Sequence, residues 1–225
     1  MSRIQERLNR LNGNKALVAF FTAGDPDLSA SKEIFSVVEK SGADIIEIGV
    51  PFSDPLADGP TIQASSQRSL QNGTTLKKII NLVTEIRGQS QLPIVLMTSF
   101  NPVFVYGQKA FVKDAVKAGV DGVIVPDLPP EEADEFLGYA NEKKLDMIFL
   151  LAPTSTPERV ERVGEISKGF IYYVSLTGTT GTKIALAKNL QEKVTSIKNK
   201  VQLPVLVGFG ISGPEQAKEA AQCSD

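Results

Sequence analysis

Short apolar runs recur along the chain, each followed by a longer amphipathic stretch, and this repetition constrains the fold more than any other feature. The runs are rich in Val, Ile, Leu and Phe and show little alternation of polar and apolar residues. Strands that are buried on both faces, as in parallel sheets covered by helices, have this composition. The predicted strands are residues 16–22, 44–49, 93–97, 122–126, 147–152, 170–175 and 204–208.

Helical periodicity occupies the intervals between these runs. Apolar residues recur at helical spacing over 29–41 and 75–87, and a proline stands at or beside the start of 130–143, 157–167 and 214–221. Ile4, Leu8 and Leu11 predict a further helix near the amino terminus. The long interval between the runs at 44 and 93 leaves room for a functional loop and two helices.

Seven strand–helix units after an N-terminal helix favour a (β/α)₈ TIM barrel whose eighth unit is missing from this chain. No Gly/Ser linker or low-complexity tract interrupts the 225 residues, so we expect a single domain over residues 1–225. Strands 1 and 7 would then lack a neighbour, and we expect open sheet edges and a weakened phosphate site. The alternative is an open doubly wound sheet, although no G-x-G-x-x-G turn follows the first run.

Composition excludes several classes of chemistry. The chain has no His, which removes Ser-His-Asp and Cys-His machinery and His-ligated zinc. Cys223 is the single cysteine, so no internal disulfide forms and a reducing compartment is expected. A net charge of −2 disfavours nucleic-acid binding, and no apolar run reaches the ~18 residues needed to span a membrane. We therefore expect a cytoplasmic protein whose acid–base chemistry falls to Asp, Glu, Lys or Tyr.

Two carboxylates flank a stiff loop after the second predicted strand. Glu47 stands inside the carboxyl end of the apolar run, and Asp58 follows a segment with several prolines. A carboxylate in such a run must face a cavity, a partner or water, because burial of an unpaired charge is costly. Taken singly, Glu47 could be bonded to neighbouring backbone or a Lys, and Asp58 could be a turn residue before Gly59. The pair, in a chain without His, favours catalysis.

Two glycine-rich stretches suggest a phosphate site. Residues 177–182 and 208–215 follow the sixth and seventh predicted strands, and glycine lets backbone N–H groups approach an anion closely. Either stretch alone could be a flexible turn. Aromatic residues at strand ends, among them Phe20, Tyr172 and Phe209, are often plain core, but beside a phosphate site they suggest a flat apolar ligand.

The segments around these candidate residues closely resemble those of one family, the alpha subunit of tryptophan synthase. The segment 46–63, IEIGVPFSDPLADGPTIQ, looks like that family's signature. Further similar stretches are FFTAGDP at 20–26, NPVF at 101–104, VPDLP at 125–129, SLTGTTG at 175–181 and VGFGIS at 207–212. The resemblance runs from Ile4 to the last residue and implies the TIM-barrel fold of that family.

The resemblance also implies an activity. The family is a lyase of tryptophan biosynthesis, and it cleaves indole-3-glycerol phosphate to indole and glyceraldehyde 3-phosphate by a retro-aldol reaction without a metal or cofactor. Glu47 matches the residue that moves protons at the indole C3 atom, and Asp58 matches the acceptor of the indole N–H. The matched substrate-binding positions are Phe20, Tyr172 and Phe209 for the indole, Gly181 and Gly210 for the phosphate, and Thr180 on a mobile loop.

The family pattern is broken at two positions: Ser99 stands where a Tyr is usual, and Thr179 where a Val is usual. The family assembles with a beta subunit that carries pyridoxal phosphate, in an alpha2-beta2 heterotetramer, and loops 50–60 and 178–187 match that contact. Two alternatives remain: a stand-alone indole-releasing lyase of the same fold, and an inactive barrel that only binds and activates a partner.

Overall fold

The computed structural model describes residues 1–55, 58–174, 183–208, 211 and 213–225, and of residues 183–189 only the helical backbone. The chain falls into two compact units. The first unit comprises Met1–Arg10 and Ala16–Met147, and the second comprises Leu11–Lys15 and Ile148–Asp225. In the described part of the chain, no helix has the length and apolar character needed to cross a membrane.

The first unit is built on a five-stranded sheet whose strand order follows the sequence, β1-β2-β3-β4-β5. Its strands are β1 (Val18–Thr22), β2 (Ile45–Gly49), β3 (Ile94–Met97), β4 (Gly122–Ile124) and β5 (Asp146–Ile148). Strands β1 to β4 pair in parallel, so their carboxyl ends meet at one edge. The register sets Glu47 beside Phe20 and Val95, and Gly49 beside Thr22 and Met97.

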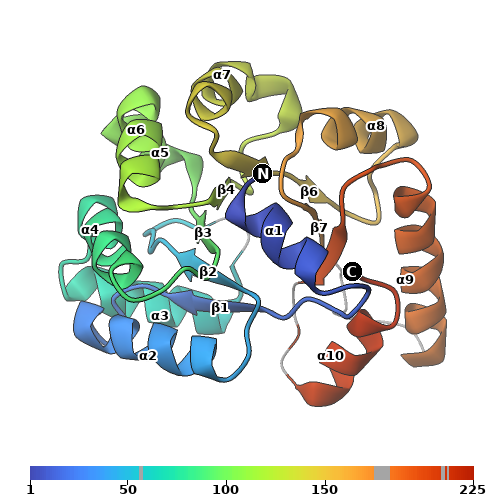
Figure 1. The fold of residues 1–225 in the computed structure, drawn as a ribbon, viewed down its shortest axis with the longest axis horizontal. Coiled ribbons are helices and arrows are strands. Elements are labelled where there is room, and N and C mark those ends of the chain that lie inside the picture. Colours follow the sequence, from blue (N-terminus) through green and yellow to red (C-terminus); the bar gives the residue numbers. More distant parts are fainter. Residues whose placement is uncertain (56–57, 175–182, 209–210, 212) are drawn as a thin grey trace. The chain divides into compact units, whose positions relative to one another are not determined.

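Helices surround these strands, except α1, which lies across the amino-terminal ends of the strands (Figure 1). They are α1 (Arg3–Arg10), α2 (Leu28–Lys40), α3 (Pro60–Gln71), α4 (Leu76–Arg87), α5 (Phe100–Tyr106), α6 (Gln108–Ala118), the 3₁₀ turn η1 (Pro130–Glu132) and α7 (Asp134–Lys143). Side-chain caps start two of them: Asp27 accepts from the Ala30 amide and Thr75 from the Lys78 amide. The predicted helix at 130–143 is thus two elements, a 3₁₀ turn and α7.

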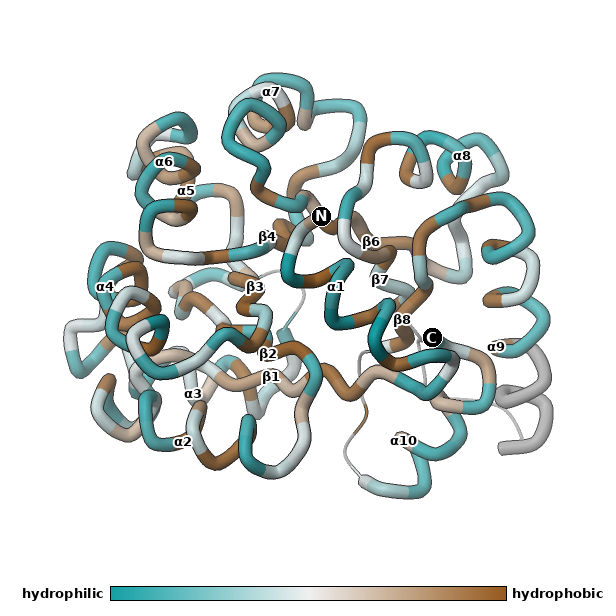
Figure 2. Tube along the Cα trace, in the orientation of Figure 1, coloured by the Kyte–Doolittle hydropathy of each residue, from teal (hydrophilic) through white to brown (hydrophobic). Residues whose placement is uncertain are grey.

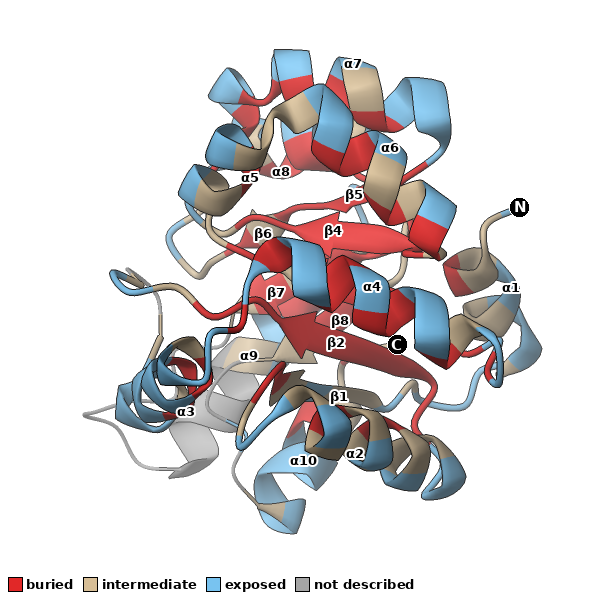
Figure 3. Ribbon diagram, turned by 90° about the vertical axis from the view of Figure 1, so that its left-hand side faces the viewer, coloured by how far each residue is buried: buried red, intermediate tan, exposed pale blue. Residues whose placement is uncertain are grey.

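The core of this unit lies between the strands and the inner faces of the helices (Figure 3). All five residues of β2 are buried, which the near-continuous apolar run predicts. Helix α4 buries an apolar stripe while its other face is exposed; the stripe is Leu76, Ile79, Ile80, Leu82, Val83 and Ile86. Figure 2 shows the same contrast: the strands of this unit are mostly hydrophobic, and the helices around them are more hydrophilic. Burial of each large apolar side chain of this core stabilises the fold by about 1.5–3 kcal/mol.

Helix α1 is tied to the amino-terminal ends of three strands by polar contacts. Ser2 Oγ donates to Asp146 Oδ2 (2.5 Å), Arg3 Nη1 to Asp121 Oδ1 (2.8 Å), and Arg7 Nη2 lies 2.9 Å from Asp44 Oδ1. These aspartates are buried where β2, β4 and β5 begin. The predicted amino-terminal helix is therefore confirmed, and its polar face anchors it to the sheet.

The second unit holds a three-stranded parallel sheet in the order β6-β7-β8. Its elements are β6 (Leu150–Leu151), β7 (Ile171–Val174), β8 (Val205–Gly208), α8 (Pro157–Ile166), α9 (Lys183–Lys198) and α10 (Pro214–Ala221). The single strand predicted at 147–152 is two short strands, β5 and β6. They pair with different neighbours: β5 adjoins β4, whereas Leu150 and Leu151 pair with β7.

Candidate active site

A pocket opens at the carboxyl ends of β1, β2 and β3 in the first unit. Its volume is about 210 Å³. Its walls combine strand-end and loop residues with the start of α3: Phe20, Thr22, Gly49, Val50, Phe52, Pro55, Asp58, Ile62, Ser66, Met97, Thr98, Ser99, Pro126 and Asp127. Parallel β/α sheets bind ligands at this edge, and the lining is largely apolar with a few polar groups, as ligand pockets are.

Phe20 forms one wall because Gly49, two residues after its register partner Glu47 on β2, has no side chain. A Cβ atom on Gly49 would lie 2.6 Å from Phe20 Cζ. The glycine therefore lets the Phe20 ring lie across the end of β2, where 37% of the residue remains exposed to the pocket and solvent. The predicted indole-wall position of Phe20 is a pocket position in the structure.

Glu47 lies on β2 two residues before the lining residue Gly49 and does not itself line the pocket. Successive side chains of a strand alternate between faces, so Glu47 and Gly49 share the face of β2 that Phe20 covers. Glu47 is 2% exposed, and within the described residues its Oε1 atom has no hydrogen-bond partner. Burial without a compensating charge raises the pKa of Glu47 from 4.5 to about 8. The buried Glu47 carboxyl is therefore held protonated at neutral pH.

Asp58 lies at the rim of the same pocket, half-buried, directly before helix α3. Gln63 Nε2 donates to the Asp58 carbonyl oxygen (2.8 Å), which fixes the backbone of Asp58 to the first turn of the helix. Partial burial raises the pKa of Asp58 above 3.8. Asp58 therefore lines the pocket, whereas Glu47 is buried on β2 two residues before the lining residue Gly49.

Several pocket residues were not predicted from the sequence. Asp127 adds a third carboxylate, and its Oδ1 accepts from the Phe100 amide at the start of α5 (2.8 Å). Thr22 and Met97 line the pocket because they are register neighbours of Gly49. The VPDLP segment carries Asp127, but only the register of β3 and β4 brings that loop beside the Glu47 strand.

The second unit repeats the aromatic-over-glycine arrangement. A Cβ atom on Gly208 of β8 would collide with the Tyr172 hydroxyl of β7, so the Tyr172 ring lies across the end of β8. Tyr172 was predicted at a strand end but is the second of the four residues of β7, and only its ring reaches the end of β8. The other predicted substrate-binding residues are Thr180, Gly181, Phe209 and Gly210, and they lie outside the described residues.

Parallel β/α units with two carboxyls at a strand-end pocket define an acid–base enzyme of the TIM-barrel class. The chain belongs to the tryptophan synthase alpha chain family, whose model matches residues 7–225. It is 54% identical over 227 residues to the tryptophan synthase alpha chain of Geobacter sp. strain M21, covering 100% of this chain and 85% of that protein. The alpha chain of Caldanaerobacter subterraneus subsp. tengcongensis is 48% identical, with 100% of this chain and 86% of that protein covered.

Solved structures agree with the sequence relatives. The alpha subunit from Legionella pneumophila strain Paris has a TM-score of 0.93 and 37% identity, covering 100% of this chain and 84% of that one. A Pyrococcus furiosus structure described as a tryptophan synthase α2β2 complex has a TM-score of 0.86 and 39% identity, covering 93% and 84% of the two chains. The predicted TIM-barrel class is confirmed. The chain is a lyase that cleaves indole-3-glycerol phosphate to indole and glyceraldehyde 3-phosphate.

Proposed function

We propose that Glu47 is the proton carrier of this cleavage and Asp58 its electrostatic partner. The observation that supports this most is the buried Glu47 carboxyl, which has a pKa of about 8 and lies on the strand whose last residue, Gly49, lines the pocket together with Asp58. General acid–base catalysis is most effective when the pKa of the group lies near the working pH, and Glu47 meets that condition.

The bond between indole C3 and the glycerol side chain breaks only after C3 has gained a proton. Protonated Glu47 gives its proton to C3, which leaves a positive charge shared with the ring nitrogen. The carboxylate then takes the proton of the adjacent side-chain hydroxyl, the C–C bond breaks, and its electrons return to the ring. Indole and the aldehyde leave, and Glu47 regains its starting proton, so the cycle balances.

Asp58 acts on the ring nitrogen in this proposal. Its carboxylate accepts the indole N–H, and the attraction strengthens as positive charge develops on the ring. Asp58 must be ionised for this, whereas the Glu47 carboxyl, with a pKa of about 8, holds its proton at neutral pH. Two carboxyls in different environments thus take opposite protonation states at the same pH.

The remaining substrate contacts are proposals of the same kind. Phe20 supplies a flat wall for the indole ring, and Tyr172 of the second unit supplies an aromatic ring across Gly208. Phe209, Thr180, Gly181 and Gly210 keep the roles that their family positions imply, the glycines binding phosphate through backbone N–H groups. Residues 1–225 would act as one domain in this scheme.

We propose that the chain works in the cytoplasm, without a cofactor of its own, with a beta subunit that holds pyridoxal phosphate in an α2β2 assembly. Loops 50–60 and 178–187 are the expected contacts. Helix α5 of the first unit supports a partner contact near the pocket. Phe104 is 64% and Val105 77% exposed, and the helix starts directly after the pocket residue Ser99. Exposed apolar groups of this kind mark interaction surfaces.

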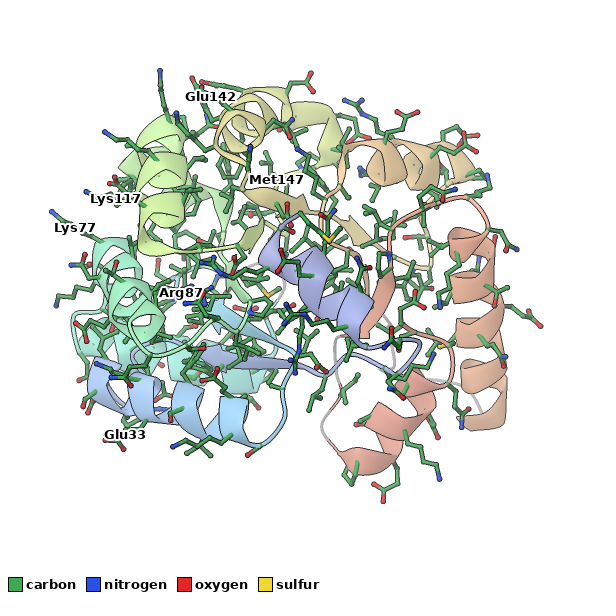
Figure 4. The ribbon with its side chains drawn as sticks, viewed as in Figure 1. Glu33, Lys77, Arg87, Lys117, Glu142 and Met147 are labelled. Atoms are coloured by element: carbon green, nitrogen blue, oxygen red, sulfur yellow. The ribbon has the colours of Figure 1, made fainter. Side chains whose placement is uncertain are left out.

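The test is release of indole from indole-3-glycerol phosphate by the purified chain, with and without a tryptophan synthase beta subunit. We expect indole and glyceraldehyde 3-phosphate in equal amounts, and faster release with the partner. Glu33→Gln is the matched control, because Glu33 is an exposed carboxylate on α2 that points away from the unit (Figure 4). An inactive chain that still stimulates the beta subunit would instead show a purely activating barrel.

A further inference from the structure

Helix α3 begins beside Asp58, yet it docks without a buried apolar side chain. Its buried residues are Ser65, Ser66 and Ser69, and its first turn is largely exposed. Helix α4 buries six apolar residues by comparison. Hydrophobic burial holds most helices in place, so the position of α3 must depend on polar contacts to an unusual degree.

Those contacts form a polar ladder between α3 and residues 22–26, the loop after β1. Its hydroxyl steps are the Thr22 Oγ1–Ser65 Oγ pair (2.8 Å) and Ser69 Oγ donating to the Ala23 carbonyl (2.5 Å). The charged step is Arg68, whose Nε and Nη2 donate to Asp25 Oδ1 and Oδ2 (2.8 and 2.7 Å). Asn72 Nδ2 donates to the Pro26 carbonyl as the last step.

The Arg68–Asp25 step has the strongest geometry of the ladder. A guanidinium matches a carboxylate through two parallel hydrogen bonds, which fixes direction as well as distance. The hydrogen bond from Arg68 lowers the pKa of Asp25, so the pair is charged at neutral pH. Arg68 is held on Asp25 and does not line the pocket, so it can act on the proposed chemistry only through other residues.

The other end of α3 holds Asp58. Gln63 donates from Nε2 to the Asp58 carbonyl and from its backbone amide to the Gly59 carbonyl (3.0 Å). Thr22, the first step of the ladder, itself lines the pocket. A shift of α3 along the ladder would therefore move Asp58 relative to the pocket wall. Misplacement of a catalytic group by about 1 Å can reduce rate by about 100-fold.

We infer that Arg68 is a positioning residue, which sets the place of the Asp58 carboxylate through α3 by its bidentate bond to Asp25. This inference rests on the role proposed for Asp58. The ladder thereby links the loop after β1 to the charge that stabilises the indole ring in the transition state.

The experiment measures indole release by the Arg68→Ala and Arg68→Lys variants in the presence of the beta subunit. Each substitution is made both in the native chain and in a chain that carries Asp58→Asn. We expect Arg68→Ala to reduce kcat about tenfold or more with little change in KM, because transition-state stabilisation is lost. Arg68→Lys keeps a charge without the bidentate geometry and should recover part of the loss. Lys32→Ala is the matched control, since it removes an exposed pair with Glu85 (3.2 Å) in the same unit.

The Asp58→Asn background tests whether Arg68 acts through Asp58. If Arg68 acts through Asp58, Arg68→Ala should cause little further loss there, because the two effects are coupled. An undiminished loss in that background, or an unchanged kcat in Arg68→Ala, would overturn the inference. Thermal unfolding of each variant separates a misplaced helix from an unfolded chain, and partial recovery in Arg68→Lys is the second readout. A near-native rate for Asp58→Asn alone would instead refute the proposed function.

Discussion

Glu47 is the residue where function and stability oppose each other most clearly. Its pKa is about 8 in the folded chain and about 4.5 when exposed, so the folded state holds the proton more tightly. The contribution of this group to the free energy of unfolding is greatest below pH 4.5. It declines as pH rises from 4.5 toward 8, by a few kcal/mol in total, because the exposed carboxyl of the unfolded chain ionises while the buried one keeps its proton.

Replacement of Glu47 by Gln should therefore separate the two properties. The amide cannot carry a proton, so indole release should fall by at least the ~10²–10⁴-fold that general acid–base catalysis provides. Stability should move the other way: urea unfolding should show the native chain and the Glu47→Gln variant nearly equal at pH 5, and the variant more stable at pH 8. A variant with more than about a tenth of native turnover, or with the same stability difference at both pH values, would contradict this role.

At the scale of elements, the two ends of the strands have different tasks. The carboxyl ends of β1 to β3 hold the pocket, whereas the amino-terminal ends hold aspartates that tie α1 to the sheet. Asp121 is the centre of this arrangement, since it accepts from Arg3, Arg87 and the Ile94 amide. Arg87 lies on the inner side of α4, close to α1, while Lys77 and Lys117 point outward (Figure 4). The charges at this end stabilise the fold rather than the chemistry.

Asp121→Asn should destabilise the chain without a specific effect on catalysis. The change leaves the Arg87 guanidinium, only 10% exposed, without its counter-charge. Breaking a buried pair by removing one partner costs about 3–5 kcal/mol, and urea unfolding at pH 7 measures the loss. Lys32→Ala, which removes an exposed pair, should cost at most about 1 kcal/mol. Equal losses of unfolding free energy in the two variants would show that the Asp121 contacts stabilise the fold no more than an exposed ion pair does.

At the scale of the whole molecule, the sequence predicts what depends on local pattern. The apolar runs and helical spacing predicted most strands and helices, and the loop after β2 predicted Glu47 and Asp58. The division of residues 147–152 into two strands was missed, because pairing with different neighbours leaves no local signal. Asp127 and the ladder on α3 were missed for the same reason, since only the register of the sheet brings Asp127 to the pocket and only the docking of α3 brings Arg68 to Asp25.

The central claim is that one buried acid and one ionised carboxylate share the pocket, and the pH dependence of kcat/KM for indole-3-glycerol phosphate tests it most directly. On the acid side, activity should rise as Asp58 ionises, at a pH above its usual 3.8. On the alkaline side it should fall near pH 8, where Glu47 of the free enzyme loses its proton. A profile that stays level to about pH 10, well past the alkaline limb expected for this acid, in a chain that remains folded would contradict the assignment of Glu47.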